Sequence, residues 1–208
     1  MFKHLLVAAV ALTAVPALAQ DDTNFNGFFI GAQTGWQQDK AKVSSNTSQS
    51  VTNDGWMYGA QVGYDYRMGT FVLGGEAMIS GSSGTSEAID NAGNSYKLNA
   101  GTTWGFSARA GWVVAEPFLL YGRFGYSWAS YNYVFNNSIE NSYDQDGITV
   151  GIGGEYQFNP NVSARLEWNY FDYGQNTFQR PPSPGTVYVP QDLNFERMGV
   201  SLGINFRF

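Results

Sequence analysis

Hydrophobic and polar residues alternate along most of this chain, for about ten residues at a time. A period of two is typical of a β-strand, whose successive side chains point to opposite faces. One face of each alternating segment carries large apolar and aromatic side chains, and the other carries glycine and polar side chains. The pattern predicts eight amphipathic strands, over residues 27–37, 56–67, 71–80, 104–112, 118–128, 148–158, 162–170 and 197–208.

The connections between these segments alternate between short and long. Residues 68–70, 113–117 and 159–161 are compact turn sequences that contain Gly or Pro. The remaining connections, which are rich in Ser, Asn, Gly and Asp, predict loops over residues 38–55, 81–98, 132–146 and 174–194. We therefore predict an all-β fold, an eight-stranded antiparallel up-and-down transmembrane barrel. It would have three short periplasmic turns and four long extracellular loops, with both chain ends beside the turns.

The polar face of the predicted strands carries charges of both signs but no lysine. The lysines fall near the N-terminus or in the predicted loops, at Lys3, Lys40, Lys42 and Lys97. Three glutamates and three arginines share the glycine-rich face: Glu76, Arg109, Arg123, Glu155, Arg165 and Glu167. Enclosed charges must be paired, and glycine makes room for long side chains inside a narrow barrel. We expect this face to line a filled lumen, although a soluble sandwich with solvent-facing charges is the alternative.

All six tryptophans fall on the apolar face, mostly near strand ends: Trp36, Trp56, Trp104, Trp112, Trp128 and Trp168. An indole ring suits the boundary between acyl chains and water, where outer-membrane barrels carry aromatic girdles. We expect these residues to mark the membrane interface. Aromatic packing in a soluble β core is the alternative, but eight such faces would overfill a small barrel.

The first 19 residues have the three parts of an export signal. Lys3 and His4 form a basic start, an apolar stretch follows over residues 5–15, and Ala17 and Ala19 provide a small-x-small cleavage site. We expect cleavage of residues 1–19 and a single barrel domain over residues 20–208. Because His4 is the single histidine and cysteine is absent, the mature chain would have neither. We therefore expect no metal site, no cofactor and no catalytic residues, and the chain is not expected to be an enzyme.

Composition adds two exclusions. No run of about 20 apolar residues is present, so a helical membrane span is not expected. The formal net charge of −6 argues against a nucleic-acid partner, which would require a basic face. The 208 residues include 25 glycines and are only 13% charged, about half the usual fraction of a soluble domain. A lipid-facing wall around a narrow polar interior accounts for these values together.

Three segments resemble a known family. The sequences GFFIGAQTGW at 27–36, WMYGAQVGYDYR at 56–67 and GVSLGINFRF at 199–208 are similar to those of the opacity-type small surface antigens. These are OmpA-type outer-membrane barrels, often labelled porin-family proteins, of alphaproteobacteria. The resemblance implies the outer membrane of a Gram-negative cell, with lipid and lipopolysaccharide as partners. The alternating end, with Ile204, Phe206 and Phe208, resembles the signal read by the barrel-assembly machinery, and periplasmic chaperones are further implied partners.

The function expected from these features is a structural or surface-antigen role in the envelope, without an open pore. Eight strands enclose an interior that side chains fill, whereas open porins use about sixteen; a narrow porin is the weaker alternative. Another alternative is loop-mediated binding of haem or a host surface ligand, as reported for some relatives. The aromatic candidates for such binding are Tyr96, Tyr131, Tyr133, Phe135, Phe178 and Tyr188. For an enzyme, the arrangement still open is a catalytic carboxylate dyad of Glu155 and Glu167. We prefer the interpretation that both residues have a structural role, paired with arginine.

The acidity of the chain is concentrated outside the predicted strands. Acidic residues there outnumber Lys40, Lys42, Lys97 and Arg180: they are Asp39, Asp54, Glu87, Asp90, Glu140, Asp144, Asp146, Asp172, Asp192 and Glu196. We expect an acidic outer surface, which could attract basic partners or divalent cations that bridge lipopolysaccharide. Simple solvation is the alternative.

Overall fold

A computed structural model describes residues 24–44, 49–83, 85–89, 95–135, 139–179 and 190–208. These residues form nine strand segments: β1 (Gly27–Ser44), β2 (Gln49–Met68), β3 (Phe71–Ser82), β4 (Thr85–Ile89), β5 (Ser95–Ala115), β6 (Phe118–Phe135), β7 (Ile139–Asn159), β8 (Val162–Gln179) and β9 (Pro190–Arg207). No helix in these ranges is long and apolar enough to cross a membrane. The signal expected over residues 1–19 lies outside the described residues and stays a prediction.

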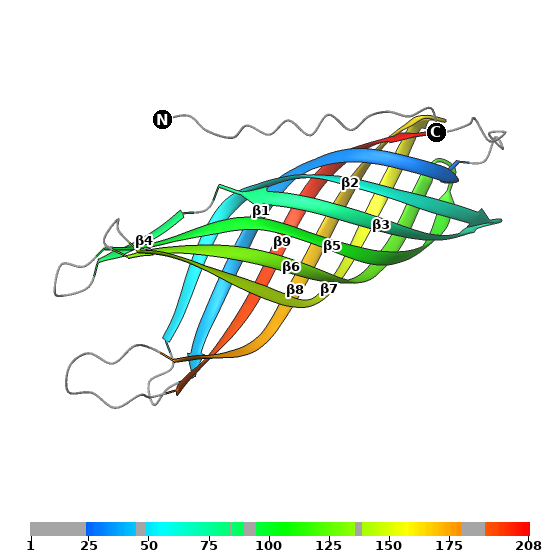
Figure 1. The fold of residues 1–208 in the computed structure, drawn as a ribbon. Coiled ribbons are helices and arrows are strands. Elements are labelled where there is room, and N and C mark those ends of the chain that lie inside the picture. Colours follow the sequence, from blue (N-terminus) through cyan, green and yellow to red (C-terminus); the bar gives the residue numbers. More distant parts are fainter. Residues whose placement is uncertain (1–23, 45–48, 84, 90–94, 136–138, 180–189) are drawn as a thin grey trace, which may run out of the picture.

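The strands close into one antiparallel barrel (Figure 1). β1 pairs with β2 on one side and with the last strand, β9, on the other. β3 and β4 both pair with β5, β3 along residues 103–112 and β4 along residues 95–99, so together they occupy one position in the wall. The barrel therefore has eight wall positions, and the predicted fold class is confirmed.

The short turns lie together at one end of the barrel, on the right in Figure 1. Gly69 adopts a positive φ of 65° in the turn between β2 and β3. In the turn between β7 and β8, the Asn159 side chain accepts hydrogen bonds from the backbone N–H groups of Asn161 and Val162, both at 2.9 Å. Such a side chain replaces a backbone turn hydrogen bond. In outer-membrane barrels the short-turn end faces the periplasm.

At the opposite end, the strands are longer than the sequence predicts. The β1–β2 ladder continues to the pair Val43 and Gln49, and the β6–β7 ladder continues to Phe135 and Ile139. The predicted loops at 38–55 and 132–146 are therefore largely strand, and the residues at their tips, 45–48 and 136–138, lie outside the described ranges. The prediction failed because a strand that leaves the membrane has water on both faces. The apolar alternation then stops while the backbone ladder continues.

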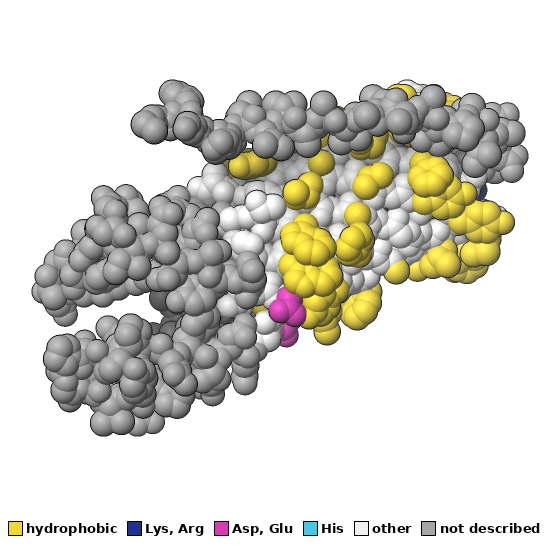
Figure 2. Space-filling model, viewed as in Figure 1, with side chains coloured by type: hydrophobic (Ala, Val, Ile, Leu, Met, Phe, Trp, Pro, Cys, Tyr) yellow, Lys and Arg dark blue, Asp and Glu magenta, His cyan; other side chains and the backbone are white. Residues whose placement is uncertain are grey.

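Large apolar side chains face outward over the barrel wall. Ile152, Leu202 and Ile204 are more than half exposed, as expected where lipid rather than protein covers the surface. Figure 2 shows hydrophobic side chains gathered over the central and right-hand parts of one face, with acidic side chains at the border of the central group. Alternation thus places an apolar wall outside and a polar core inside.

Candidate functional site

The lumen is the most unusual feature of the molecule, because buried charged side chains fill it. All six charges predicted for the polar face point inward and are at most 6% exposed. The structure adds further inward-facing charges from β1, β2 and β9 that were not part of the predicted network: Asp39, Asp65, Arg197 and Arg207. The signal that could have identified Asp65, Arg197 and Arg207 is their position on the polar face of predicted strands. Asp39 carries no such signal, because it lies beyond the predicted strand at 27–37.

Four of these residues form a closed set of ion pairs near the short turns, which we call the lower quartet. It consists of Asp65, Arg109, Glu155 and Arg207, from β2, β5, β7 and β9. A carboxylate oxygen of Asp65 lies 2.6 Å from Arg109 and 2.9 Å from Arg207. Glu155 lies 2.9 Å from Arg109 and 3.3 Å from Arg207. Each carboxylate thus bridges both arginines, and the quartet has no net formal charge.

A second set, the upper quartet, lies further along the same lumen. It consists of Glu76 on β3, Arg123 on β6, and Arg165 and Glu167 on β8. Glu76 lies 3.0 Å from Arg123 and 2.8 Å from Arg165. Glu167 completes the set at 3.5 Å from Arg123 and 3.3 Å from Arg165. The six predicted charges therefore belong to two separate quartets rather than to one network.

Glycine and small polar residues make these quartets possible. A Cβ at Gly153 would stand 2.7 Å from the ring of Tyr121 and 2.9 Å from Cγ of Glu167, closer than side-chain carbons pack. Ser163 donates a hydrogen bond to Glu155 at 2.6 Å, and Asn205 donates one at 3.3 Å. Buried carboxylates require such donors in addition to ion pairs. The inward-facing glycines therefore leave the room that the long side chains occupy.

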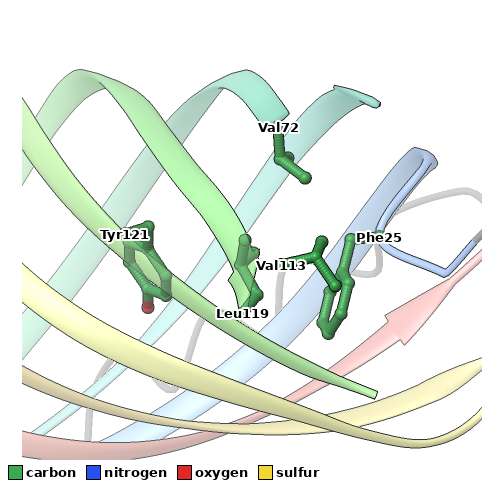
Figure 3. Close-up of a cluster of buried hydrophobic side chains, with 5 residues drawn as sticks. All are labelled: Phe25, Val72, Val113, Leu119 and Tyr121. Carbon is green, nitrogen blue, oxygen red and sulfur yellow. The ribbon is translucent and has the colours of Figure 1, made fainter. Parts of the chain in front are cut away.

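Apolar layers lie on both sides of the quartets. Towards the short turns, the side chains of Phe25, Val72, Val113, Leu119 and Tyr121 form a buried cluster (Figure 3). Towards the other end, a second cluster contains Met78, Ala129, Phe171 and Tyr173. Buried apolar side chains thus lie at both ends of the region that the two quartets occupy.

A further ion pair lies beside the second apolar cluster. Asp39 accepts a hydrogen bond from Nε of Arg197 at 2.6 Å, and the Arg197 guanidinium lies 5.7 Å from the Tyr173 ring centre. The prediction that Asp39 belongs to an acidic outer loop is wrong, since β1 extends past Asp39 and places it on the inward face. The other described acidic residues of that set also lie on strands rather than in loops: Asp54, Glu87, Glu140, Asp144, Asp146, Asp172, Asp192 and Glu196. Asp90 lies outside the described residues, and the rest of the predicted outer acidity is therefore carried by strands.

The two carboxylates considered as a dyad do not lie together. Glu155 and Glu167 belong to different quartets, and each has two arginine partners. A general acid or base needs an exchangeable proton within reach of a substrate, whereas both carboxylates are at most 1% exposed. This arrangement holds charge in place.

The predicted interface residues lie on the outside of the wall. Five of the six tryptophans are 41–63% exposed, and Trp128 is partly covered by the stacked ring of Trp104 at 4.3 Å. Trp112 lies 4.7 Å from Phe71 at the short-turn end, so aromatic residues occur towards both ends of the wall. The predicted assembly residues Ile204, Phe206 and Phe208 also face outward, and N–H of Phe208 donates to the carbonyl of Phe28 at 2.9 Å.

Comparison with known proteins identifies the family. The model of the outer membrane protein beta-barrel domain matches residues 6–208. The 31 kDa outer-membrane immunogenic protein of Brucella melitensis is 27% identical, with all of this chain and 95% of that protein aligned. The 22 kDa outer membrane protein of Rhizobium leguminosarum is 30% identical over 72% of this chain and 66% of that protein.

Solved structures show the same fold. Neisserial surface protein A superposes with a TM-score of 0.55 at 18% identity, covering 89% of this chain and 100% of that one. OprG of Pseudomonas aeruginosa superposes with a TM-score of 0.53 at 14% identity, covering 90% and 99%. With a closed barrel, an apolar outer wall and a family match over nearly its whole length, the chain belongs to the outer membrane protein β-barrel family, and it is a protein of the outer membrane.

Proposed function

We propose that this protein is a structural barrel of the envelope that presents its strand ends at the cell surface and does not conduct. The observation that carries the proposal is the filled lumen, in which two quartets of ion pairs lie between two apolar clusters. A solute would have to separate eight paired charges to pass. Breaking a buried pair costs about 3–5 kcal/mol, so the closed arrangement is strongly favoured.

The same observation supports a non-enzymatic role. The carboxylates of the two quartets are each paired with two arginines, and Glu155 also accepts hydrogen bonds from Ser163 and Asn205. The names of the Brucella relatives describe immunogenic proteins, which supports a surface-exposed position for this chain. Binding of a partner by the strand ends is the second candidate, supported by the extension of the ladders beyond the outward-facing tryptophans Trp36 and Trp56. The side chains of Tyr96, Tyr131, Tyr133, Phe135, Phe178 and Tyr188 lie outside the described part of the structure.

The conduction part of the proposal is tested in planar lipid bilayers. The purified barrel is expected to give no steady single-channel steps, while a sixteen-stranded porin in the same lipid gives them. A double variant, Arg123→Ala with Glu167→Ala, removes one arginine and one carboxylate of the upper quartet together and therefore leaves its net charge unchanged. Reproducible large steps from the unaltered barrel would overturn the proposal. Steps from the double variant alone would support the quartet as the barrier.

A further inference from the structure

The residues just before β1 cross the short-turn mouth of the barrel. Phe25 is fully buried although it precedes the first strand, and it packs with Val72, Val113 and Leu119 (Figure 3). These partners come from β3, β5 and β6, which follow β2 around the wall, and β6 lies on the side of the barrel opposite β1. Residues 24–27, which we call the latch, therefore span the opening instead of hanging from its edge.

Hydrogen bonds tie the latch to three further parts of the mouth. The backbone N–H of Phe25 donates to the side-chain oxygen of Gln157 on β7 at 2.8 Å. Asn26 accepts from the backbone N–H of Arg67 on β2 at 3.1 Å. Asn24 donates to Glu116, in the turn between β5 and β6, at 2.6 Å. With these bonds, one short segment connects β2, the β5–β6 turn and β7.

A charged pair at the rim supports these contacts. Arg67 pairs with Glu116 and donates to the carbonyl oxygen of Asn24 at 3.1 Å. The hydrogen bond from Arg67, followed by that from Asn24, lowers the pKa of Glu116 from its ordinary value of 4.5. The carboxylate is therefore charged at neutral pH, and it accepts hydrogen bonds from both donors.

The backbone of the latch is bent in an unusual way. Phe25 has a φ of 61°, a left-handed conformation that is uncommon for a residue with a large side chain. Gly27 has a φ of 106°, and a Cβ there would lie 2.6 Å from the carbonyl oxygen of Phe208. Strained backbone of this kind persists only where the surroundings determine it. Here the bends direct the Phe25 ring into the lumen.

We propose that residues 24–27 are an N-terminal latch that seals the periplasmic mouth of the barrel and seats only after the wall has closed. The order follows from the contacts, since the pocket for Phe25 needs β3 paired with β5, and Gly27 lies against the last residue of the chain. The sealed mouth keeps periplasmic water from Arg109 and Arg207 of the lower quartet, which both lie over the ring of Phe29 just inside the mouth.

The latch is tested by labelling a buried position behind Phe25. The chain has no cysteine, so Val113→Cys introduces a single thiol, and its reaction with a hydrophilic maleimide is followed by mass in detergent micelles. The full-length folded barrel carrying only Val113→Cys should be protected, since a buried thiol reacts only through local opening. Adding Phe25→Ala should raise the labelling rate by about tenfold or more.

Matched variants separate the latch from general loosening. Phe28→Ala removes an aromatic ring from the lipid-facing side of the same strand start and should leave the labelling rate unchanged. Gly27→Ala should raise the rate as Phe25→Ala does, because it opposes the bend. Should Phe25→Ala fail to fold, judged by loss of resistance to SDS at room temperature, Phe25→Leu replaces it with a smaller expected increase. Equal rates with and without Phe25, or rapid labelling of Val113→Cys alone, would overturn the proposal.

Discussion

At the scale of single residues, the arginines of the lumen determine what the interior tolerates. Arg109 donates from Nε and Nη2 to the two oxygens of Asp65, at 2.7 and 2.6 Å, and also reaches Glu155. Its guanidinium lies over the rings of Phe29 and Tyr121, at 5.1 and 4.7 Å. A lysine could not reproduce this planar, forked contact. The quartets therefore depend on the identity of the cation as well as on its charge.

Removing Arg109 is expected to be severely destabilising. In Arg109→Ala, the buried carboxylate of Asp65 keeps a single ion-pair partner, and breaking a buried pair from one side costs about 3–5 kcal/mol. Urea unfolding of the barrel in lipid vesicles measures this loss of unfolding free energy. The unfolding free energy of Arg109→Lys should lie between those of the unaltered barrel and Arg109→Ala. Asp54→Asn changes an exposed acid and should cost less than about 1 kcal/mol. Equal losses from Arg109→Ala and Asp54→Asn would show that the lower quartet contributes little.

At the scale of elements, the alternation of the sequence determines most of the fold. The eight predicted segments lie within strands apart from Phe208, which follows the last residue of β9. Parity alone places Glu76 and Arg165 inside and Trp104 outside. The sequence could not reveal where strands end outside the membrane, because polar residues occupy both faces there. It also could not reveal the burial of Phe25, which stands before the alternation begins. The division of the charges into two quartets depends on the register between neighbouring strands. Alternation within one strand does not specify that register.

The last strand allows a test that separates assembly from stability. Phe208 faces outward and is 47% exposed, and its backbone bond to Phe28 does not depend on the side chain. Phe208→Ala should therefore change the urea midpoint of the refolded barrel only slightly, while lowering the amount found in the outer membrane of cells several-fold. Phe158→Ala is the matched control, since it is an outward-facing aromatic residue, 63% exposed, at the same end of another strand. Equal outer-membrane levels for the two variants would refute an assembly role for Phe208.

At the scale of the whole molecule, the interior is arranged in layers along the barrel axis. The latch and the cluster around Val113 close one end, the two quartets follow, and the cluster around Phe171 closes the other end. All of these layers lie within the part of the barrel that carries the apolar wall. The outer parts of the strands therefore contribute little to the layers that stabilise the closed barrel.

Shortening an outer hairpin tests this separation. Replacing residues 42–50 with Asn-Gly would leave Ala41 and Val51 as the closing pair, with the register of β1 and β2 unchanged. The shortened barrel should keep its resistance to SDS and, in cells, preserve envelope integrity. A loss of adhesion with intact envelope integrity would assign partner binding to this hairpin. Loss of the folded barrel would show instead that the outer ladder is needed for closure.

The ladders beyond the outer tryptophans have an immunological consequence. Lys40 stands opposite Thr52 on one side and Glu196 on the other, so residues far apart in the sequence are neighbours on the strand ends. An antibody footprint covers about 800 Å² and would span several strands. An epitope formed by these neighbouring strand ends would therefore be composite, and it would depend on the closed barrel.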